Sequence, residues 1–404
     1  MTTYYVAMNG SNSGTGSSSS PWRTINKAMT ANLKSGDEVV VRSGTYNEGV
    51  YISKNGITLR SEVPGGAKID PPSGKIGINI GGDNVTVKGF DVYGSTTAGI
   101  VGKGVHHVDV LDNIIHHNKD NGIVFIESDF LLIDGNVVYE NASLRARSGI
   151  SIFHPENVTG NNSFNGFRII VRNNVSYKNQ NDTGHTDGNG IIFDDFNATQ
   201  SSKLPAYKYP TLIENNILYS NGGPGVMVYL SENVTVRGNT AWKNNIDPKS
   251  SSTWRGEFQN QASDRTTWVD NIAVADPKIN KHNTAIGNFS FKGDKNTDVV
   301  WRNNTTFNGT SGDDSVSTNN GNAAPSASSN NLGRNPNLSD ASVKSMAAKL
   351  GNATAAGSGK ADAAADGNAG GGTVDKSAGG VLNGTVGNDS LSGKSGADTL
   401  NGKA

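Results

Sequence analysis

Short runs of alternating apolar and polar residues recur along this chain from about residue 80 to residue 310. The runs are three to five residues long and return with a period in the twenties, as in VTVKGFDVYGSTTAGIV and VDVLDNIIHHNKDNGIVF. A unit of this size cannot bury its own apolar face, so successive units must stack on one another. The pattern therefore predicts an all-β solenoid, a parallel β-helix with three strands in each coil.

Asparagine marks the corners between the predicted strands. One corner residue must enter the left-handed backbone region, which asparagine tolerates better than any residue except glycine. Stacked asparagine side chains can also bond to the coils above and below, which favours a structural role over glycosylation. Four equivalent corners are Asn173-Asn174, Asn215-Asn216, Gly238-Asn239 and Asn303-Asn304.

A glycine precedes one strand in each coil and aligns the coils with one another. Alternation sends the next residue inward, and the residues two and four positions after the glycine outward. The coil HTDGNGIIFDDF then carries the most polar set, with Asp187 before its strand and Asp194 and Asp195 at its end. The aligned glycines are Gly99, Gly122, Gly149, Gly190 and Gly225.

The two ends of the predicted solenoid differ from the coils. The segment TINKAMTANL has helical spacing, which predicts a capping helix near residues 22–33 and coils over about 35–320. A helix there would cover the open end of the solenoid, whose bare edge invites aggregation. Residues 335–357 are expected to form the last packed piece at the other end.

Composition narrows the class of protein. The 404 residues carry a net charge of −1 without a basic run, so nucleic acid is not an expected partner. No stretch approaches the ~20 apolar residues that span a bilayer. The first residues lack the features of a classical signal peptide, and there is no cysteine. We expect a monomer without a membrane span.

Two nonapeptides near the end of the chain, GTVGNDSLS and GKSGADTLN, keep Gly, Asp and Leu at fixed positions. They resemble the calcium-binding repeats of RTX proteins, which implies Ca²⁺ binding at Asp389 and Asp398. The resemblance also implies a secreted, extracellular protein that leaves the cell through a type I secretion system. The C-terminal signal that such an exporter reads does not follow, so we expect a truncated chain.

These features predict three parts of the chain. The first is a β-helix catalytic domain at residues 1–357, whose cap occupies about 1–50. A Gly/Ala/Ser/Asp-rich flexible linker follows at 358–380, and the RTX repeats begin at 381–404.

Candidate functional residues gather around the polar coil. Two insertions, 197–210 and 246–254, interrupt the repeat beside it, and we expect them to form two walls of one groove. The coil below would place Arg147 and His154 about 4.8 Å from the aspartates by strand spacing. The other candidates are Arg255, two coils above, and the side chains suited to binding sugar, namely Phe153, Tyr229, Trp254 and His185.

Three neighbouring carboxylates raise one another's pKa unless a cation is bound. One chemistry that fits is β-elimination, in which Ca²⁺ held by the aspartates neutralises a uronate carboxylate and another side chain takes the C5 proton. The other is hydrolysis, with one aspartate as general acid and a second that activates water or attacks directly.

Residues 4–310 resemble right-handed parallel β-helix polysaccharide lyases, notably pectate lyases of family 9. Asp187-Gly188 matches the first calcium motif of that family, but the next coil, SNGGPGVMV, has no Asp, and no Lys stands at the expected base position. The substrate and base of that family therefore do not carry over. A β-helix with RTX repeats is also similar to rhizobial exopolysaccharide glycanases and to mannuronan C5-epimerases, whose usual catalytic motif is not visible here.

The leading hypothesis is a secreted, Ca²⁺-dependent lyase that acts on an acidic, uronic-acid-containing polysaccharide. The alternatives are a glycoside hydrolase with an aspartate pair, a C5-epimerase-like enzyme, and a non-catalytic adhesin that binds polysaccharide. The expected catalytic residues are His154, Arg147, Arg255 and Asp194, and the expected metal ligands in the groove are Asp187, Asp194 and Asp195.

Overall fold

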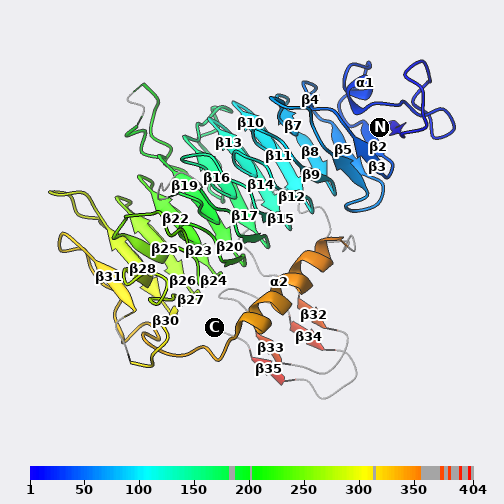
Figure 1. Ribbon diagram of the computed structural model, residues 1–404. Coiled ribbons are helices and arrows are strands. Elements are labelled where there is room, and N and C mark those ends of the chain that lie inside the picture. The colour runs from blue at the N-terminus through cyan, green and yellow to red at the C-terminus, as the bar shows by residue number, and fades with distance from the viewer. Residues whose placement is uncertain are drawn as a thin grey trace. The chain divides into compact units, whose positions relative to one another are not determined.

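The computed structural model describes residues 1–181, 187–200, 203–312 and 315–355, together with four short strands between 374 and 401 (Figure 1). The chain divides into two compact units, one of which contains residues 1–161 and 167–359. In this unit three sheets share the strands, and every pairing between neighbouring strands is parallel. Each coil contributes one strand to each sheet, which is the arrangement of a parallel β-helix.

Sheet 1 has eleven strands: β1 (Thr3–Val6), β2 (Glu38–Val41), β5 (Thr58–Ser61), β8 (Val85–Lys88), β11 (His106–Leu111), β14 (Asp129–Asp134), β17 (Ile169–Arg172), β20 (Thr211–Glu214), β23 (Val234–Arg237), β26 (Thr267–Val269) and β29 (Val300–Arg302). Sheet 2 has ten: β4 (Val50–Ile52), β7 (Ile78–Ile80), β10 (Ile100–Lys103), β13 (Ile123–Ile126), β16 (Ile150–Phe153), β19 (Ile191–Asp194), β22 (Val226–Tyr229), β25 (Arg255–Gln261), β28 (Asn283–Phe289) and β31 (Val316–Thr318). Sheet 3 also has ten: β3 (Gly44–Tyr46), β6 (Ala67–Ile69), β9 (Asp91–Tyr93), β12 (Ile114–His116), β15 (Val137–Tyr139), β18 (Val175–Tyr177), β21 (Ile217–Tyr219), β24 (Thr240–Trp242), β27 (Ile272–Val274) and β30 (Thr305–Phe307).

The predicted glycine column is confirmed along sheet 2. Ile150 pairs with Ile123 below it and Ile191 above it, and all three side chains are fully buried. A Cβ on Gly149 would lie 2.8 Å from the carbonyl oxygen of Gly190, closer than real Cβ contacts allow. The stack of coils therefore requires glycine in this column, while the isoleucines form the core.

Asparagine ladders hold the corners, as predicted. Asn173 has a left-handed φ of 55°, and the next residue bonds to the coil above. The backbone N–H of Asn174 donates to Asn216 Oδ1 at 2.9 Å, and its side-chain Nδ2 donates to the same oxygen at 3.0 Å. A second ladder, at a corner that was not predicted, runs through Asn118, Asn141, Asn179, Asn221 and Asn244.

The second ladder ends at a carboxyl group. Glu257 is fully buried, and its Oε1 accepts the backbone N–H of Asn244 at 2.9 Å. Burial raises the pKa of Glu257 to about 8. The side chain therefore closes the ladder as a neutral acid at pH 7.

The N-terminal helix α1 (Ile25–Met29) is shorter than predicted but covers the core as expected. Thr24 caps it, and Ile25, Ala28 and Met29 are buried against the first coils. The Glu48 carboxylate accepts the backbone N–H of Ile25 at 2.7 Å, which satisfies one of the unpaired donors at the helix start.

The expectation for residues 335–357 is wrong in position. They contain a helix, α2 (Asp340–Ala355), which packs on the outer face of sheet 3 rather than across the end of the coils (Figure 1). Val343 and Ala347 are buried against Val175, Ile217 and Trp242. The reason is that sheet 3 presents apolar residues outward, and these need a cover.

The second unit contains residues 162–166 and 360–404. Its strands pair in parallel: β32 (Val374–Lys376) with β34 (Leu391–Gly393), and β33 (Val381–Asn383) with β35 (Thr399–Asn401). Val381 pairs with Thr399, 18 residues later, which equals two nonapeptides. Asp389 and Asp398 lie outside the described residues.

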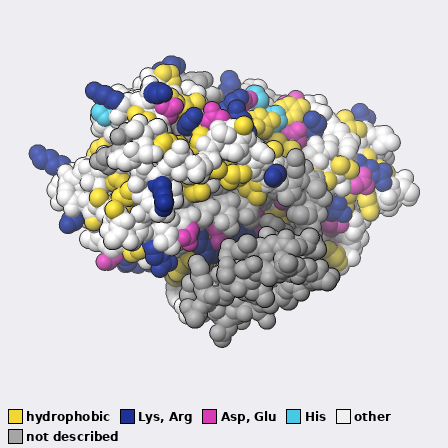
Figure 2. Space-filling model, turned by 90° about the horizontal axis from the view of Figure 1, so that it is seen from below, with side chains coloured by type: hydrophobic (Ala, Val, Ile, Leu, Met, Phe, Trp, Pro, Cys, Tyr) yellow, Lys and Arg dark blue, Asp and Glu magenta, His cyan; other side chains and the backbone are white. Residues whose placement is uncertain are grey.

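Charged side chains are mixed on the surface. On the described part of the face in Figure 2, basic and acidic side chains are scattered among apolar and neutral polar ones. This mixture agrees with the net charge of −1. Among the described residues, no helix is long and apolar enough to cross a membrane.

Candidate functional site

A cleft of about 580 Å³ lies over the outer face of sheet 2. Its floor comes from successive strands, and one wall contains Gln200 from the insertion 197–210. The other wall contains Ser252 and Trp254 from the insertion 246–254. The predicted groove between the two insertions is therefore confirmed as a feature of the structure.

Strand register brings three polar side chains into one column of this cleft. Asp194 of β19 pairs with Tyr229 of β22, which in turn pairs with Gln261 of β25. Neighbouring strands lie about 4.8 Å apart, so each of these side chains is within reach of the next. Asp187 lines the same cleft from the residues before β19 and accepts a hydrogen bond of 3.3 Å from Asn189 Nδ2.

Asp194 is a carboxyl group that holds its proton at neutral pH. Burial raises its pKa to about 8, and the charges of Asp187 and Asp195 add to the effect. Gln200 Nε2 donates to Asp194 Oδ1 at 2.8 Å, which orients the carboxyl. The pKa of Tyr229 is also raised, first by burial and then by the nearby aspartates.

The expected outward orientation of Asp195 is wrong. Its backbone has a left-handed φ of 60°, and the residue is 1% exposed. Its carboxylate accepts the backbone N–H of Thr199 at 2.8 Å and that of Gln200 at 3.0 Å. Asp195 therefore holds the first residues of the insertion 197–210 in place and does not face the cleft.

His154 lies behind Asp195. Its Nδ1 is 2.8 Å from Asp195 Oδ2, and the residue is 6% exposed. His154 is not among the residues that line the cleft. His154 therefore supports the Asp195 carboxylate. It would contact a substrate directly only if the surrounding structure opened.

The two predicted arginines have protein partners. Arg147 Nε lies 2.6 Å from Asp120 Oδ1. Arg255 is 2% exposed, donates to Asn283 Oδ1 at 2.8 Å, and also contacts the carbonyl of Asn245. Its guanidinium also donates to the carbonyl of Ser250 at 3.4 Å, and so anchors the insertion 246–254.

The four predicted sugar-binding residues have three different outcomes. Tyr229 and Trp254 line the cleft. Phe153 is half-buried, and its ring centroid lies 4.2 Å from that of His154. His185 lies outside the described residues.

The predicted three-carboxylate calcium site does not fit this arrangement. Asp195 is engaged by His154 and by backbone N–H groups, so only Asp187 and Asp194 of the three face the cleft. Among the residues that the structure describes, no group of three or more His, Asp or Glu side chains is placed to hold a metal ion. No catalytic step is therefore assigned to calcium in this cleft.

Several residues of the cleft do not stand out in the sequence. Arg145, Gln259 and Gln261 line the cleft together with Gln200. Alternation within GEFQNQ would have pointed Gln259 and Gln261 outward. This alternation could not be aligned with the other coils, because the insertion at 246–254 obscures the register of β25. The pairing of β25 with β22 defines that register.

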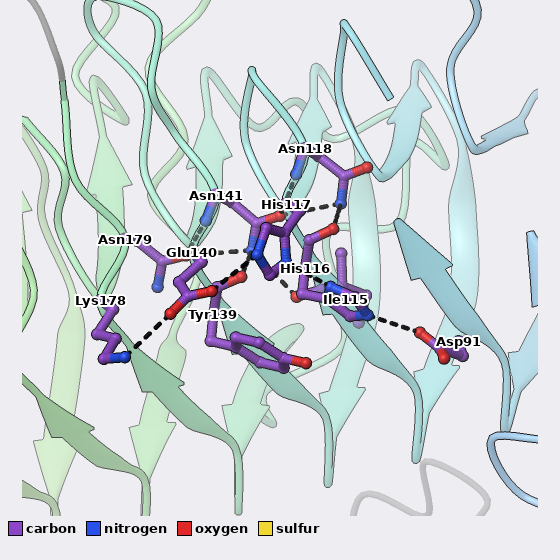
Figure 3. A network of polar contacts seen from close by, with 10 residues as sticks. All are labelled: Asp91, Ile115, His116, His117, Asn118, Tyr139, Glu140, Asn141, Lys178 and Asn179. Atoms are coloured by element: carbon purple, nitrogen blue, oxygen red, sulfur yellow. Dashed lines mark hydrogen bonds and ion pairs between the residues drawn. The ribbon is translucent and has the colours of Figure 1, made fainter. Parts of the chain in front are cut away.

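A second polar network lies on sheet 3 (Figure 3). His116 Nε2 is 3.0 Å from Asp91 Oδ1, and His117 Nε2 is 2.9 Å from Glu140 Oε2. Lys178 Nζ completes the chain at 3.0 Å from Glu140 Oε1. Every charged group in this network has a partner of opposite charge or a histidine, which is typical of a structural ladder.

Comparison with known proteins bears on the fold. A family described as right handed beta helix region matches residues 32–167, and a protein family of unknown function, DUF1565, matches residues 8–51. With the three parallel sheets, the first match confirms the predicted right-handed parallel β-helix. No curated protein matches the chain.

Solved structures with similar coils include several polysaccharide-acting enzymes. An alginate lyase from Paenibacillus sp. str. FPU-7 is 16% identical, with a TM-score of 0.49 over 80% of this chain and 94% of that chain. Pectate lyase Pel9A is 17% identical, with a TM-score of 0.44 over 84% and 82%. The A-module of the mannuronan C-5 epimerase AlgE4 from Azotobacter vinelandii is 13% identical, with a TM-score of 0.36 over 70% and 91%. At these identities and scores the likeness concerns the fold alone.

Proposed function

We propose that this chain is an enzyme that cleaves an acidic polysaccharide by β-elimination in the cleft over sheet 2. The observation that carries the proposal is Asp194, a half-buried carboxyl whose pKa is raised to about 8, in register with the Tyr229 hydroxyl. Titratable groups with perturbed pKa values in a cleft are typical of catalytic sites.

The shape of the cleft favours an extended polymer. Ile192, Met227 and Gln259 form its floor and come from three successive coils. Each coil adds about 4.8 Å of surface along the axis of the helix, so the floor continues in one direction. A chain of sugar rings can lie along such a surface.

Elimination needs a base, an acid and a group that withdraws charge from the uronate carboxylate. Deprotonated Asp194 is a stronger base than an ordinary aspartate because its pKa is raised, and it takes the C5 proton. The C5 electrons form the C4–C5 double bond, the C4–O bond breaks, and Tyr229 donates its proton to the leaving oxygen. Tyr229 suits this role since its raised pKa keeps it protonated.

Neutral and basic side chains in the cleft can bind the uronate carboxylate. Arg145 lines the cleft and offers a bidentate guanidinium. Gln259 Nε2 donates to Gln261 Oε1 at 2.7 Å, which orients the second amide. The Nε2 hydrogens of Gln261 can then donate to a bound carboxylate.

Hydrolysis is the second candidate, because Asp187 and Asp194 share the cleft. Protonated Asp194 would act as general acid on the glycosidic oxygen, and the Asp187 carboxylate would activate water or attack the sugar. This mechanism uses the opposite protonation state of Asp194.

One experiment separates the two reactions. The full chain is incubated with alginate, polygalacturonate and hyaluronan, and both the ultraviolet absorbance of unsaturated uronates and the new reducing ends are followed against pH. Elimination predicts absorbance and a rate that rises as the pH passes about 8, whereas hydrolysis predicts reducing ends alone and a rate that falls there. Absence of both products from every polymer would contradict the proposal.

From the nonapeptides alone, we also propose that the chain is secreted through a type I system and binds Ca²⁺ at Asp389 and Asp398. Detection of the full-length protein outside an exporting host, and its loss when the exporter is deleted, would test this. Calcium titration of the chain tests the sites directly: equal Ca²⁺ uptake by wild type and by the Asp389→Asn and Asp398→Asn variants, or none by any of them, would contradict the proposal.

A further inference from the structure

An exposed aromatic residue stands at one end of the cleft. Phe291 follows β28 by two residues, and 40% of its surface is exposed. The column of Asp194 continues through Tyr229 and Gln261 to Phe289, the last residue of β28. Phe289 therefore lies three coils from Asp194, a distance of about 14 Å at ~4.8 Å per coil.

Phe291 belongs to a group of aromatic rings that is continuous with the cleft. Trp254, which lines the cleft, stacks on Phe289 with ring centroids 5.5 Å apart and an angle of 10°. Phe291 lies 6.0 Å from Trp254 and 6.3 Å from Tyr229, both measured between ring centroids. Phe289 itself is buried, so it supports Trp254 from below.

The backbone around Phe291 is held in place. Its carbonyl oxygen accepts the backbone N–H of Asp294 at 3.0 Å and Asn320 Nδ2 at 2.8 Å. Asn320 Nδ2 also donates to the carbonyl of Ser290 at 2.7 Å, and Ser290 Oγ donates to the carbonyl of Asp294 at 2.7 Å. An exposed ring on a fixed turn pays little conformational entropy when it binds a ligand.

The charge of this turn suits an acidic sugar. Lys292 and Lys295 are exposed on either side of a single exposed acid, Asp294. A pyranose ring has apolar C–H faces that pack on aromatic rings, while its carboxylate favours nearby ammonium groups.

We infer that Phe291, with Trp254 beside it, is a binding subsite for a sugar ring of an acidic polysaccharide, on the far side of Tyr229 from Asp194. The inference rests on the proposed function and adds to it a subsite beyond the two side chains that act on the reacting bond. A substrate must extend past the sugars at Asp194 and Tyr229 to occupy it.

The first test compares substrate lengths. Phe291→Ala should raise KM for long chains of the cleaved polymer about tenfold with little change in kcat, and should leave kcat/KM for disaccharides unchanged. Tyr51→Ala is the matched control, because Tyr51 is 53% exposed on the same sheet and lies far from the cleft in the first coils. Equal losses on short and long substrates, or no loss on either, would overturn the inference.

The second test does not depend on turnover. Wild type, Phe291→Ala and Tyr51→Ala are run through native gels that contain alginate, polygalacturonate, hyaluronan or neutral dextran. The inference expects an acidic polymer to retard wild type and Tyr51→Ala several-fold more than Phe291→Ala, with dextran retarding none. Retardation that depends on Phe291 without any cleavage would support the subsite and contradict the proposed function. Equal retardation of all three proteins, or none by any acidic polymer, would contradict the subsite.

Discussion

Two outward-facing columns of the same solenoid differ in composition. On sheet 3, Tyr139, Tyr177 and Tyr219 stack with centroid distances of 4.9 and 4.7 Å. On sheet 2, the column that crosses the cleft holds Asp194 and Tyr229, whose pKa values are raised. The identical rings on sheet 3 pack on one another. The unlike residues on sheet 2 leave their polar groups available to a ligand, and such a column indicates a ligand-binding site.

The same contrast appears in the charges. On sheet 3, Glu140 lies 3.0 Å from Lys178 and 2.9 Å from His117, which lowers the pKa of Glu140, chiefly through the hydrogen bond from Lys178. On sheet 2, burial beside other carboxylates raises the pKa of Asp194 instead. One surface stabilises its charges with protein partners. The other keeps a carboxyl neutral until the pH rises or a ligand binds.

The largest expected effect is on activity. Asp194→Asn should lower kcat on the cleaved polymer by roughly 10²-fold or more, since it removes the group that exchanges a proton with substrate. The side chain faces the cleft, so the melting temperature should not fall. Glu140→Gln on sheet 3 is the control and should keep full activity. Equal activity of the two variants would place the reaction elsewhere on the solenoid.

The second-largest expected effect is on stability, and it also distinguishes the two columns. Tyr177→Ala removes the middle ring of the sheet 3 stack and part of the surface covered by α2. We expect a loss of about 2 kcal/mol in the free energy of unfolding, measured by urea denaturation. Turnover at temperatures where the variant is folded should be unchanged. Tyr51→Ala, which removes an exposed ring, should change stability by less than about 0.5 kcal/mol.

The raised pKa of Asp194 also predicts how stability changes with pH. Below its ordinary value of 3.8, both folded and unfolded chains carry the proton. Between 3.8 and about 8 only the folded chain keeps it, so stability falls as the pH rises through this range. The free energy of unfolding of wild type, relative to Asp194→Asn, should drop by up to about 5 kcal/mol from pH 4 to pH 8, since each pKa unit corresponds to about 1.36 kcal/mol. Parallel pH curves for the two proteins would show that Asp194 has an ordinary pKa.

The smallest effect concerns Gln200. Its hydrogen bond to Asp194 Oδ1 lowers the pKa of that carboxyl, against the larger effect of burial. Gln200→Ala should therefore move the midpoint of the pH–rate profile upward, by less than about one pH unit. Lys208→Ala, an exposed residue near the other end of the same insertion, is the control. A downward shift in Gln200→Ala would contradict the role given to this hydrogen bond.

Much of the site was predictable because it follows from register. The alternation after Gly190 placed Ile191 inward and Asp194 outward, and the structure agrees. The two insertions were expected to border one groove, and residues of both line the cleft. The roles of these residues remain predictions.

The remaining errors have a common physical source. Asp195 and His154 lie at left-handed corners with φ values of 60° and 47°, where a two-residue alternation no longer tells which way a side chain points. Arg255 stands at the start of an unusually long strand, and its side chain donates to carbonyls of the insertion that precedes it, at Asp247 and Ser250. In both cases the side chains bond to segments that lie outside the repeated strand pattern.

The sequence by itself determined the coils of this protein. Period-two alternation, glycines whose Cβ would strike the next coil, and asparagines at left-handed corners leave no other compact arrangement for units this short. The tertiary structure alone decided the pKa of Asp194, because that pKa depends on burial in the cleft and on the nearby charges of Asp187 and Asp195. Local pattern sets the backbone path, whereas the chemistry of the cleft depends on which segments exclude water from it.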